Sequence, residues 1–214
     1  MTRKTFSASL ATLLLLTSAM LPLQARAEDD DGDILSEARI LRDPAIPVIG
    51  NADGDITIVE YFDYQCPYCR KISPDLAKVV RDDGHIRLIF KDWPIFGGPS
   101  IYAARMTLAA KYQDKFAEAH EALISLKDKL SEANADAALS AAGIDLARAK
   151  ADLAAKGSEI DAVLAHNHEQ AMGLGFQGTP AFIIGRFRVP GAPNAQAFKQ
   201  AIADARKAAA ASTK

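Results

Sequence analysis

Apolar and β-branched residues form two short segments on either side of a stretch with helical periodicity. Ile56–Phe62 reads ITIVEYF and follows a turn of Asn, Asp and Gly residues, which is typical of a buried strand. Over Pro67–Asp83 the apolar residues recur at helical spacing and Gly84 follows, so this stretch is predicted to be a helix. Residues 86–91 form a second predicted strand. A right-handed crossover would make the two strands parallel neighbours.

The pattern then becomes rich in alanine between residues 99 and 174, with helical periodicity and no predicted strand. The polar and glycine-containing breaks predict four or five helices in this block. They fall at residues 113–114, near 131, at 143–145 and at 157–158.

Strand patterns return at Ala181–Ile184 and at residues 187–189, and a last helix is predicted over residues 194–210. Without the helical block, the elements make a four-stranded mixed sheet flanked by helices. The expected organisation is a tail and lead-in over residues 28–54, half of an α/β unit over 55–96, a helical insertion over 97–175 and the second half over 176–212.

The first 27 residues have the pattern of a secretory signal peptide. Arg3 and Lys4 give a charged start, an apolar run follows, and Ala25-Arg26-Ala27 is a small-x-small cleavage site. The apolar run is too short to span a bilayer, although an uncleaved N-terminal anchor stays open as an alternative. We therefore expect export to the periplasm, where cysteines meet an oxidising environment.

Composition excludes several classes of protein. The 214 residues are 49% hydrophobic with a formal net charge of −2, which suits a globular chain with one substantial core. The near balance of charge predicts no nucleic-acid partner. The chain has only two cysteines, so it is not a disulfide-rich scaffold.

The two cysteines are Cys66 and Cys69, separated by Pro67 and Tyr68. Cys66 follows a predicted strand and opens a predicted helix, where free N–H groups and the helix dipole stabilise a thiolate. Such a position lowers a thiol pKa from ~8.5 to roughly 3.5–7.5. Cys69, one turn further on, is placed to resolve a mixed disulfide formed by Cys66.

The pair has two alternative interpretations, an inert disulfide and a metal site. An inert Cys66–Cys69 disulfide would close so short a loop that it would restrict the unfolded chain very little. A zinc site needs further ligands, and His166 and His168 lie two positions apart in a helical run, where side chains point to different sides. A redox dithiol is the favoured interpretation, with no metal and no cofactor other than its own redox-active disulfide.

Two segments carry a family resemblance. The first reads EYFDYQCPYC from Glu60 to Cys69, and the second reads GTPAFIIG from Gly178 to Gly185. Together they resemble the DsbA family of thioredoxin-fold thiol-disulfide oxidoreductases, and most of all its ScsC-like exported branch. The resemblance covers residues 40–205 and implies an α/β thioredoxin fold with an inserted helical domain. Glutaredoxins share Cys-Pro-Tyr-Cys but are small and cytoplasmic.

The resemblance also implies roles for residues near the second segment. Pro180 would be a cis-proline facing the cysteine pair, and Thr179 would present backbone groups to a substrate strand. A simple loop proline is the alternative, since Pro180 opens a predicted strand where no ladder hydrogen bond is lost. Substrate contacts are expected at Pro67, Tyr68, Gly178 and Phe176. An apolar rim for unfolded substrates is expected from Tyr64, Tyr68, Trp93 and Phe176.

Glu60 is a carboxylate inside a predicted buried strand, where a charge needs a partner or a role. It lies six positions before Cys66, where the chain resembles DsbA relatives that place an acid beneath the active site. We expect Glu60 to exchange a proton with Cys69, with Lys91 on the neighbouring strand as its counter-ion. Alternatively, Glu60 reaches the sheet edge and solvent.

The expected function is the donation of disulfides to unfolded or thiol-containing exported proteins, with a membrane redox partner. Isomerase and reductase directions stay open, because Pro-Tyr and Thr179 occur on both the oxidising and isomerising sides of the superfamily. About 20 residues separate Ala27 from the core, which favours a monomer. A copper-binding or chaperone-like protein is the rival, although no Met-rich or His-rich tract supports it.

Overall fold

The computed structural model describes residue 1 and residues 33–212. The predicted signal peptide, and most of the acidic tail that follows it, lie outside the described residues. Within them, no helix combines the length and apolarity needed to cross a membrane.

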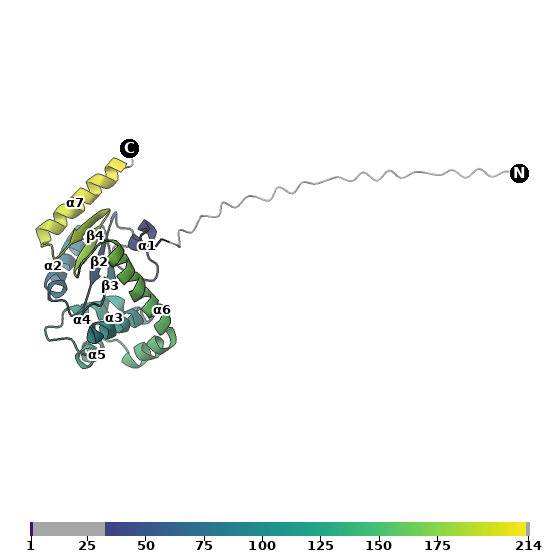
Figure 1. Cartoon of the computed structure of the whole chain (residues 1–214), viewed down its shortest axis with the longest axis vertical. Coiled ribbons are helices and arrows are strands. Elements are labelled where there is room, and N and C mark those ends of the chain that lie inside the picture. Colours follow the sequence, from purple (N-terminus) through teal and green to yellow (C-terminus); the bar gives the residue numbers. More distant parts are fainter. Residues whose placement is uncertain (2–32, 213–214) are drawn as a thin grey trace. The chain divides into compact units, whose positions relative to one another are not determined.

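Five strands form one mixed sheet in the order β1-β3-β2-β4-β5. Figure 1 labels its three middle strands, β3, β2 and β4. The central strands β2 (Ile56–Phe62) and β3 (Ile86–Asp92) are parallel and are joined by α2 (Pro67–Asp83), as the crossover rule predicted. β4 (Ala181–Ile184) and β5 (Phe187–Pro190) complete one side by antiparallel pairing. The predicted thioredoxin-fold class is therefore confirmed.

The sheet contains one strand more than the sequence pattern indicated. β1 (Val48–Gly50) pairs antiparallel with β3 at the other edge. It is only three residues long and follows Pro47, so it is too short to show alternation of apolar and polar residues.

Helices cover both faces of the sheet. α2 buries its predicted apolar side and ends at Gly84, whose left-handed φ of 73° suits glycine. α7 (Ala195–Ser212) packs with α2 on the same face, and the rings of Phe182 and Phe198 lie 5.1 Å apart there. α1 (Glu37–Leu41) and α6 (Leu146–Gly173) cover the opposite face.

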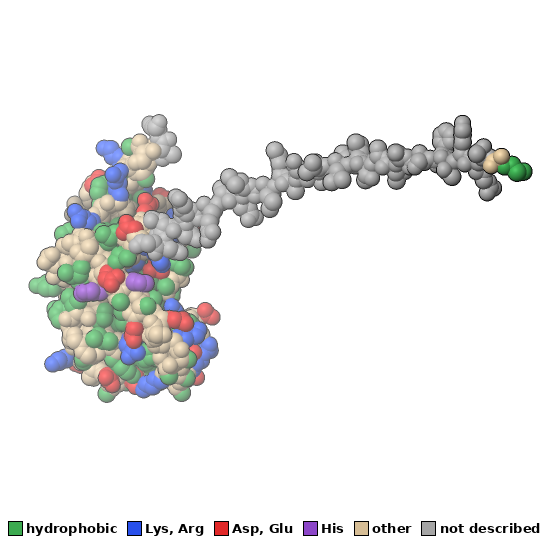
Figure 2. Space-filling model, turned by 45° about the vertical axis from the view of Figure 1, so that its right-hand side comes forward, with side chains coloured by type: hydrophobic (Ala, Val, Ile, Leu, Met, Phe, Trp, Pro, Cys, Tyr) green, Lys and Arg blue, Asp and Glu red, His purple; other side chains and the backbone are tan. Residues whose placement is uncertain are grey.

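The insertion contains α3 (Gly98–Ala110), a 3-10 turn (Lys111–Gln113), α4 (Phe116–Ile124), α5 (Glu132–Ala141) and α6. In Figure 1, α3, α4 and α5 lie below the sheet and α6 runs back along it. The break predicted at residues 157–158 is a kink in α6 at Lys156, where φ is −122°. On the face shown in Figure 2, basic and acidic side chains are interspersed and form no continuous basic area.

Candidate active site

Cys66 lies at the start of α2, and residues 63–65 separate it from Phe62, the last residue of central strand β2. It is the N-cap residue, and its Sγ accepts a hydrogen bond from the backbone N–H of Cys69 at 3.4 Å. Pro67 occupies the first turn, where its missing N–H removes no helical hydrogen bond. The predicted strand-to-helix position of the cysteine pair is thus confirmed.

The environment of Cys66 favours its thiolate. Its pKa is lowered to about 6, mainly by a hydrogen bond from the Cys69 thiol, against the opposing effect of burial. Backbone N–H groups of Cys69 and Tyr68 lower it further. At neutral pH Cys66 is therefore a thiolate in most molecules, and it can act as a nucleophile or a leaving group.

Cys69 has the opposite character. It is fully buried, and burial raises its pKa, with a further rise from its hydrogen bond to Cys66. Both cysteines are free thiols in the structure. Their opposed acidities separate an attacking sulfur from a resolving one.

Glu60 is buried in the middle of β2, and its side chain leaves the strand on the face that α2 and α7 cover. Burial raises the pKa of its carboxyl well above the usual range, and the charge of Cys66 adds to this. Within residues 33–212 no hydrogen bond lowers its pKa. Because Glu60 is buried in a central strand, the alternative in which it reaches the sheet edge and solvent is wrong.

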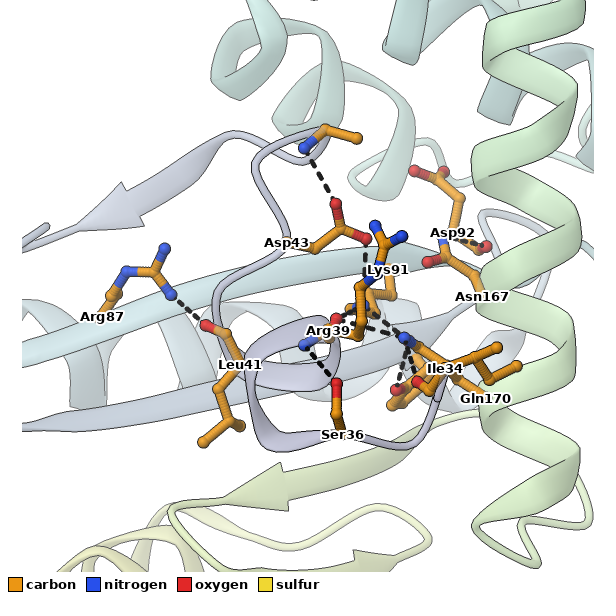
Figure 3. Close-up of polar contacts among 12 residues, drawn as sticks. Ile34, Ser36, Arg39, Leu41, Asp43, Arg87, Lys91, Asp92, Asn167 and Gln170 are labelled. Atoms are coloured by element: carbon orange, nitrogen blue, oxygen red, sulfur yellow. Dashed lines mark hydrogen bonds and ion pairs between the residues drawn. The ribbon is translucent and has the colours of Figure 1, made fainter. Parts of the chain in front are cut away.

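The predicted counter-ion for Glu60 is also wrong. Lys91 is in register with Tyr61, so its side chain leaves the opposite face of the sheet from Glu60. There Lys91 Nζ lies 3.7 Å from Asp43 Oδ2 and 2.6 Å from Gln170 Oε1, next to the segment around α1 (Figure 3). The register between β2 and β3 decides which side chains share a face, because a shift of one residue moves a side chain to the other face. The sequence pattern does not fix that register.

The second predicted segment lies against Cys66. The Thr179–Pro180 peptide bond is cis, as the resemblance implied, and the Cys66 thiol lies 3.3 Å from the carbonyl oxygen of Thr179. Pro180 is buried, while Gly178 and Thr179 are partly exposed. Pro67, which follows Cys66 in the chain, is exposed. Cys66 is therefore bordered by Pro67 within its own motif and by Thr179 from the second segment.

The apolar rim expected from the aromatic residues needs correction. Tyr68 is 61% exposed, but the other three members are buried. Phe176 packs on Tyr61 with ring centroids 5.6 Å apart, so it belongs to the core rather than to a substrate-binding surface. Tyr64 is hydrogen-bonded to His120, and Trp93 donates to His168. These tertiary partners are distant in sequence, so local pattern did not reveal the burial.

Sequence analysis missed Asp63 and the loop after β3. The Asp63 carboxylate is buried and accepts hydrogen bonds from the N–H groups of Gln65, Ile95 and Phe96 and from the Ser100 hydroxyl. The available signal was an Asp two positions before Gln65, a spacing typical of an Asx turn. Ile95 and Phe96 are 42% and 46% exposed.

The part of the chain that the structure describes has no group of three or more His, Cys, Asp or Glu side chains arranged to hold a metal ion. His168 is one of the two histidines of the alternative metal site, and its Nδ1 accepts a hydrogen bond from Trp93 Nε1 at 3.0 Å.

Comparison with known proteins identifies the family. Residues 43–204 match the family model described as Thioredoxin. The chain belongs to the thioredoxin family. This thioredoxin-family chain is similar to a thioredoxin-like oxidoreductase from Silicibacter pomeroyi DSS-3, with 37% identity and a TM-score of 0.77 over 80% of this chain and 98% of that one.

Two other structures confirm the predicted likeness to DsbA-like and ScsC-like proteins. The catalytic domain of Proteus mirabilis ScsC is 28% identical with a TM-score of 0.70, over 78% of this chain and 93% of that one. The thiol-disulfide exchange protein alpha-DsbA2 from Wolbachia pipientis is 26% identical with a TM-score of 0.74, over 80% of this chain and 93% of that one.

Among curated proteins, the thioredoxin-family chain is similar to part of Na(+)/H(+) antiporter NhaA 1 from Salinispora arenicola. The two are 30% identical over 209 residues, which cover 94% of this chain and 31% of the antiporter. A similar antiporter from Salinispora tropica is 28% identical and is covered over 24% of its length. The chain thus spans less than a third of the length of these curated relatives.

Proposed function

We propose that this thioredoxin-family protein is an exported thiol-disulfide oxidoreductase that donates disulfides to other proteins. Its fold and its cysteine pair are those of thiol-disulfide exchange enzymes. The observation that carries the proposal is the low pKa of Cys66, about 6, beside the buried Cys69. A thiol of low pKa is a good leaving group and stabilises the reduced form of the enzyme.

The proposed reaction begins with the oxidised Cys66–Cys69 disulfide. A client thiolate attacks Cys66 Sγ, forming a mixed disulfide and releasing the Cys69 sulfur, which takes up a proton. A second client thiolate then attacks the client sulfur of the mixed disulfide and releases the Cys66 thiolate. The client loses two electrons and the enzyme gains them. A membrane redox partner would later remove these electrons.

Glu60 is the proposed proton carrier for Cys69. The raised pKa of Cys69 means that its sulfur must gain a proton when it leaves and lose one when it attacks. The Glu60 side chain leaves β2 on the face covered by α2 and α7, and α2 carries Cys69. Burial is the main cause that raises the pKa of Cys69, and Glu60, when ionised, raises it further.

The cis-proline segment is proposed to align the client. Gly178 and Thr179 are partly exposed beside Cys66, so their backbone groups are available to an extended polypeptide, with Pro67 and Tyr68 on the other side. We also propose that the protein is exported and that its signal peptide is cleaved after Ala27. It would act as a monomer, without a metal or a bound cofactor.

The reduction potential of the Cys66/Cys69 couple tests the proposed direction. A value near −120 mV, roughly that of a strong disulfide donor, together with oxidation of a reduced protein client, would support donation. A value of about −270 mV would instead indicate a reductase and overturn the donor assignment. Cys66→Ser should abolish client oxidation and serves as the control for uncatalysed exchange.

A further inference from the structure

Arg70 joins the turn before Cys66 to the helical insertion. It lies in the first turn of α2, directly after Cys69, and its side chain is half-buried. Its Nε donates to the carbonyl oxygen of Tyr64 at 2.6 Å, and its Nη1 donates to the carbonyl oxygen of Asp128 at 2.8 Å. Asp128 belongs to the segment between α4 and α5. One guanidinium therefore holds two segments that are distant in sequence.

The peptide unit between Tyr64 and Gln65, just before Cys66, is held at both ends. Arg70 donates to the carbonyl oxygen of this unit, and the Asp63 carboxylate accepts from its N–H at 2.7 Å. The next N–H, that of Cys66, donates to the carbonyl oxygen of Asp63 at 3.1 Å. The turn that presents the reactive sulfur is thereby fixed by two side chains of opposite charge.

The first turn of α2 is joined less firmly to the rest of the helix than in an uninterrupted helix, because α2 contains Pro74. Pro74 has no N–H, so it cannot donate to the carbonyl oxygen of Arg70 as another helical residue would. The turn that carries both cysteines therefore lacks one helical hydrogen bond. The Arg70 side chain connects this turn to groups outside the helix instead.

The guanidinium also places a positive charge near the reactive sulfur. The Cys66 thiolate and Asp63 both raise the pKa of Arg70, against the larger lowering effect of burial. Interactions between charges are mutual, so Arg70 stabilises the Cys66 thiolate in turn. This effect adds to the hydrogen bonds that dominate the pKa of Cys66. Glu60 and Cys69 are the other ionisable groups that interact with Cys66, and burial raises the pKa of both.

We propose that Arg70 is a positioning residue that sets the reactivity of Cys66 and makes it depend on the helical insertion. It fixes the turn before the reactive sulfur, ties that turn to the segment between α4 and α5, and places a positive charge beside the thiolate. This inference rests on the proposed function. A stabilised thiolate favours the reduced form of the enzyme, so Arg70 makes the protein a stronger disulfide donor.

The test compares Arg70→Met and Arg70→Lys with the control Lys71→Met. Lys71 is the adjacent, exposed residue of α2, so its replacement removes the same charge without touching the turn. The ultraviolet absorbance of the thiolate, followed against pH in the reduced protein, gives the midpoint of Cys66 ionisation. Arg70→Met should raise this midpoint by about half a pH unit, which is the order expected for one nearby charge in a partly solvated site.

Arg70→Met should also move the equilibrium with reduced and oxidised glutathione about threefold towards the disulfide form of the enzyme, because the reduced form loses thiolate stabilisation. Arg70→Lys keeps the charge but cannot reach both carbonyl oxygens, so its midpoint should rise by less. Hydrogen exchange of the Gln65 amide and of the amides in residues 126–130 should become faster in both Arg70 variants. Lys71→Met should leave these quantities at their wild-type values.

An unchanged midpoint in Arg70→Met would overturn the proposal, and so would an equal rise in Lys71→Met, which would reduce the effect to general surface charge. Wild-type values in Arg70→Lys for both the midpoint and the amide exchange would overturn the positioning role. Arg70→Lys remains informative if Arg70→Met fails to fold. Failure of the proposed function would look different, since the wild-type potential would then be that of a reductase while the shifts between variants persisted.

Discussion

Cys66 and Cys69 are chemically identical residues whose surroundings give them opposite acidities. Both are buried, but Cys66 receives a hydrogen bond from the Cys69 N–H at the N-terminus of α2, while Cys69 lies one turn inside the helix. Glu60, six residues earlier, is buried on the same side of the sheet. At the scale of residues, the site therefore consists of one group that readily loses a proton and two that retain theirs.

Alkylation of the reduced protein should report the acidity of Cys66 directly. Because its pKa is lowered to about 6, the rate of reaction with iodoacetamide should rise with pH through a midpoint near 6 and level off above it. Cys69 should not react in the folded protein over this range, since burial raises its pKa and keeps it as the unreactive thiol. In Cys69→Ala the midpoint should move upward, because the Cys69 thiol provides the largest lowering effect. A midpoint near the ordinary value for cysteine would contradict this account.

Glu60→Gln should slow the steps in which the Cys69 sulfur gains or loses a proton. General acid–base assistance contributes about 10²–10⁴-fold, so we expect a fall of at least about tenfold in resolution of a trapped mixed disulfide. Initial attack by Cys66 on a small disulfide should change much less. Rapid quenching and mass analysis of the mixed disulfide would measure both, and unchanged kinetics would remove Glu60 from the mechanism.

At the scale of elements, helix α7 is fixed to the sheet by a double ion pair as well as by its apolar side. The guanidinium of Arg206 binds Asp55, next to the start of β2, at 2.8 Å, and Asp83, at the end of α2, at 2.7 to 2.8 Å. The planar fork of arginine suits two carboxylates at once. One side chain therefore joins two helices and a strand.

Arg206→Lys should destabilise the fold by about 1 kcal/mol, because an ammonium cannot reproduce the fork and the site is partly solvated. The free energy of unfolding in urea measures this. Arg105→Lys is the comparison and should cost less, since Arg105 pairs with one carboxylate among residues 33–212, that of Asp161. Arg206 lowers the pKa of Asp55 and Asp83, so its contribution should be complete above about pH 4 and be lost as the pH falls and these carboxylates take up protons. Equal losses of unfolding free energy in the two variants would contradict the conclusion that the Arg206 guanidinium stabilises the fold by binding two carboxylates at once.

At the scale of the whole described unit, Lys91 joins three separate segments on the face away from the cysteines. Its buried ammonium contacts Asp43, the carbonyl oxygen of Arg39 and the side chain of Gln170 in α6 (Figure 3). Gln170 in turn donates to the carbonyl oxygens of Ile34 and Arg39. The lead-in segment is thereby attached to the sheet and to the helical insertion through its own backbone.

Lys91→Met should lower the free energy of unfolding by about 3 kcal/mol, because removing one partner of a buried ion pair leaves the other without compensation. Asp43→Asn combined with Lys91→Met should recover part of this loss. Hydrogen exchange of the α1 amides should also become faster. Lys78→Met is the control, since Lys78 forms an exposed pair with Asp82 within one helix and should cost less than about 0.5 kcal/mol. If Lys91→Met lowered the free energy of unfolding no more than Lys78→Met does, the proposed role of Lys91 in attaching the lead-in segment would be contradicted.

Most of the architecture could be predicted from the sequence because it rests on local signals. Ile56–Phe62 and Pro67–Asp83 have exactly the bounds that their apolar spacing indicated, and the cysteine pair occupies the predicted strand-to-helix junction. The three-residue strand β1 carried too little pattern to be found. The cis bond before Pro180 was predictable only through family resemblance, since most X-Pro bonds are trans.

The sequence by itself determined the order of elements, the placement of the redox motif and the need for a special environment around Glu60, because periodicity, capping and turn chemistry act over a few residues. The tertiary structure alone decided which face each side chain occupies and which distant partner it meets. It paired Lys91 with Asp43 rather than Glu60, buried Phe176 against Tyr61 and made Asp63 the anchor of the loop beside Cys66. Register and long-range packing set these contacts, and neither is encoded in any single stretch of the chain.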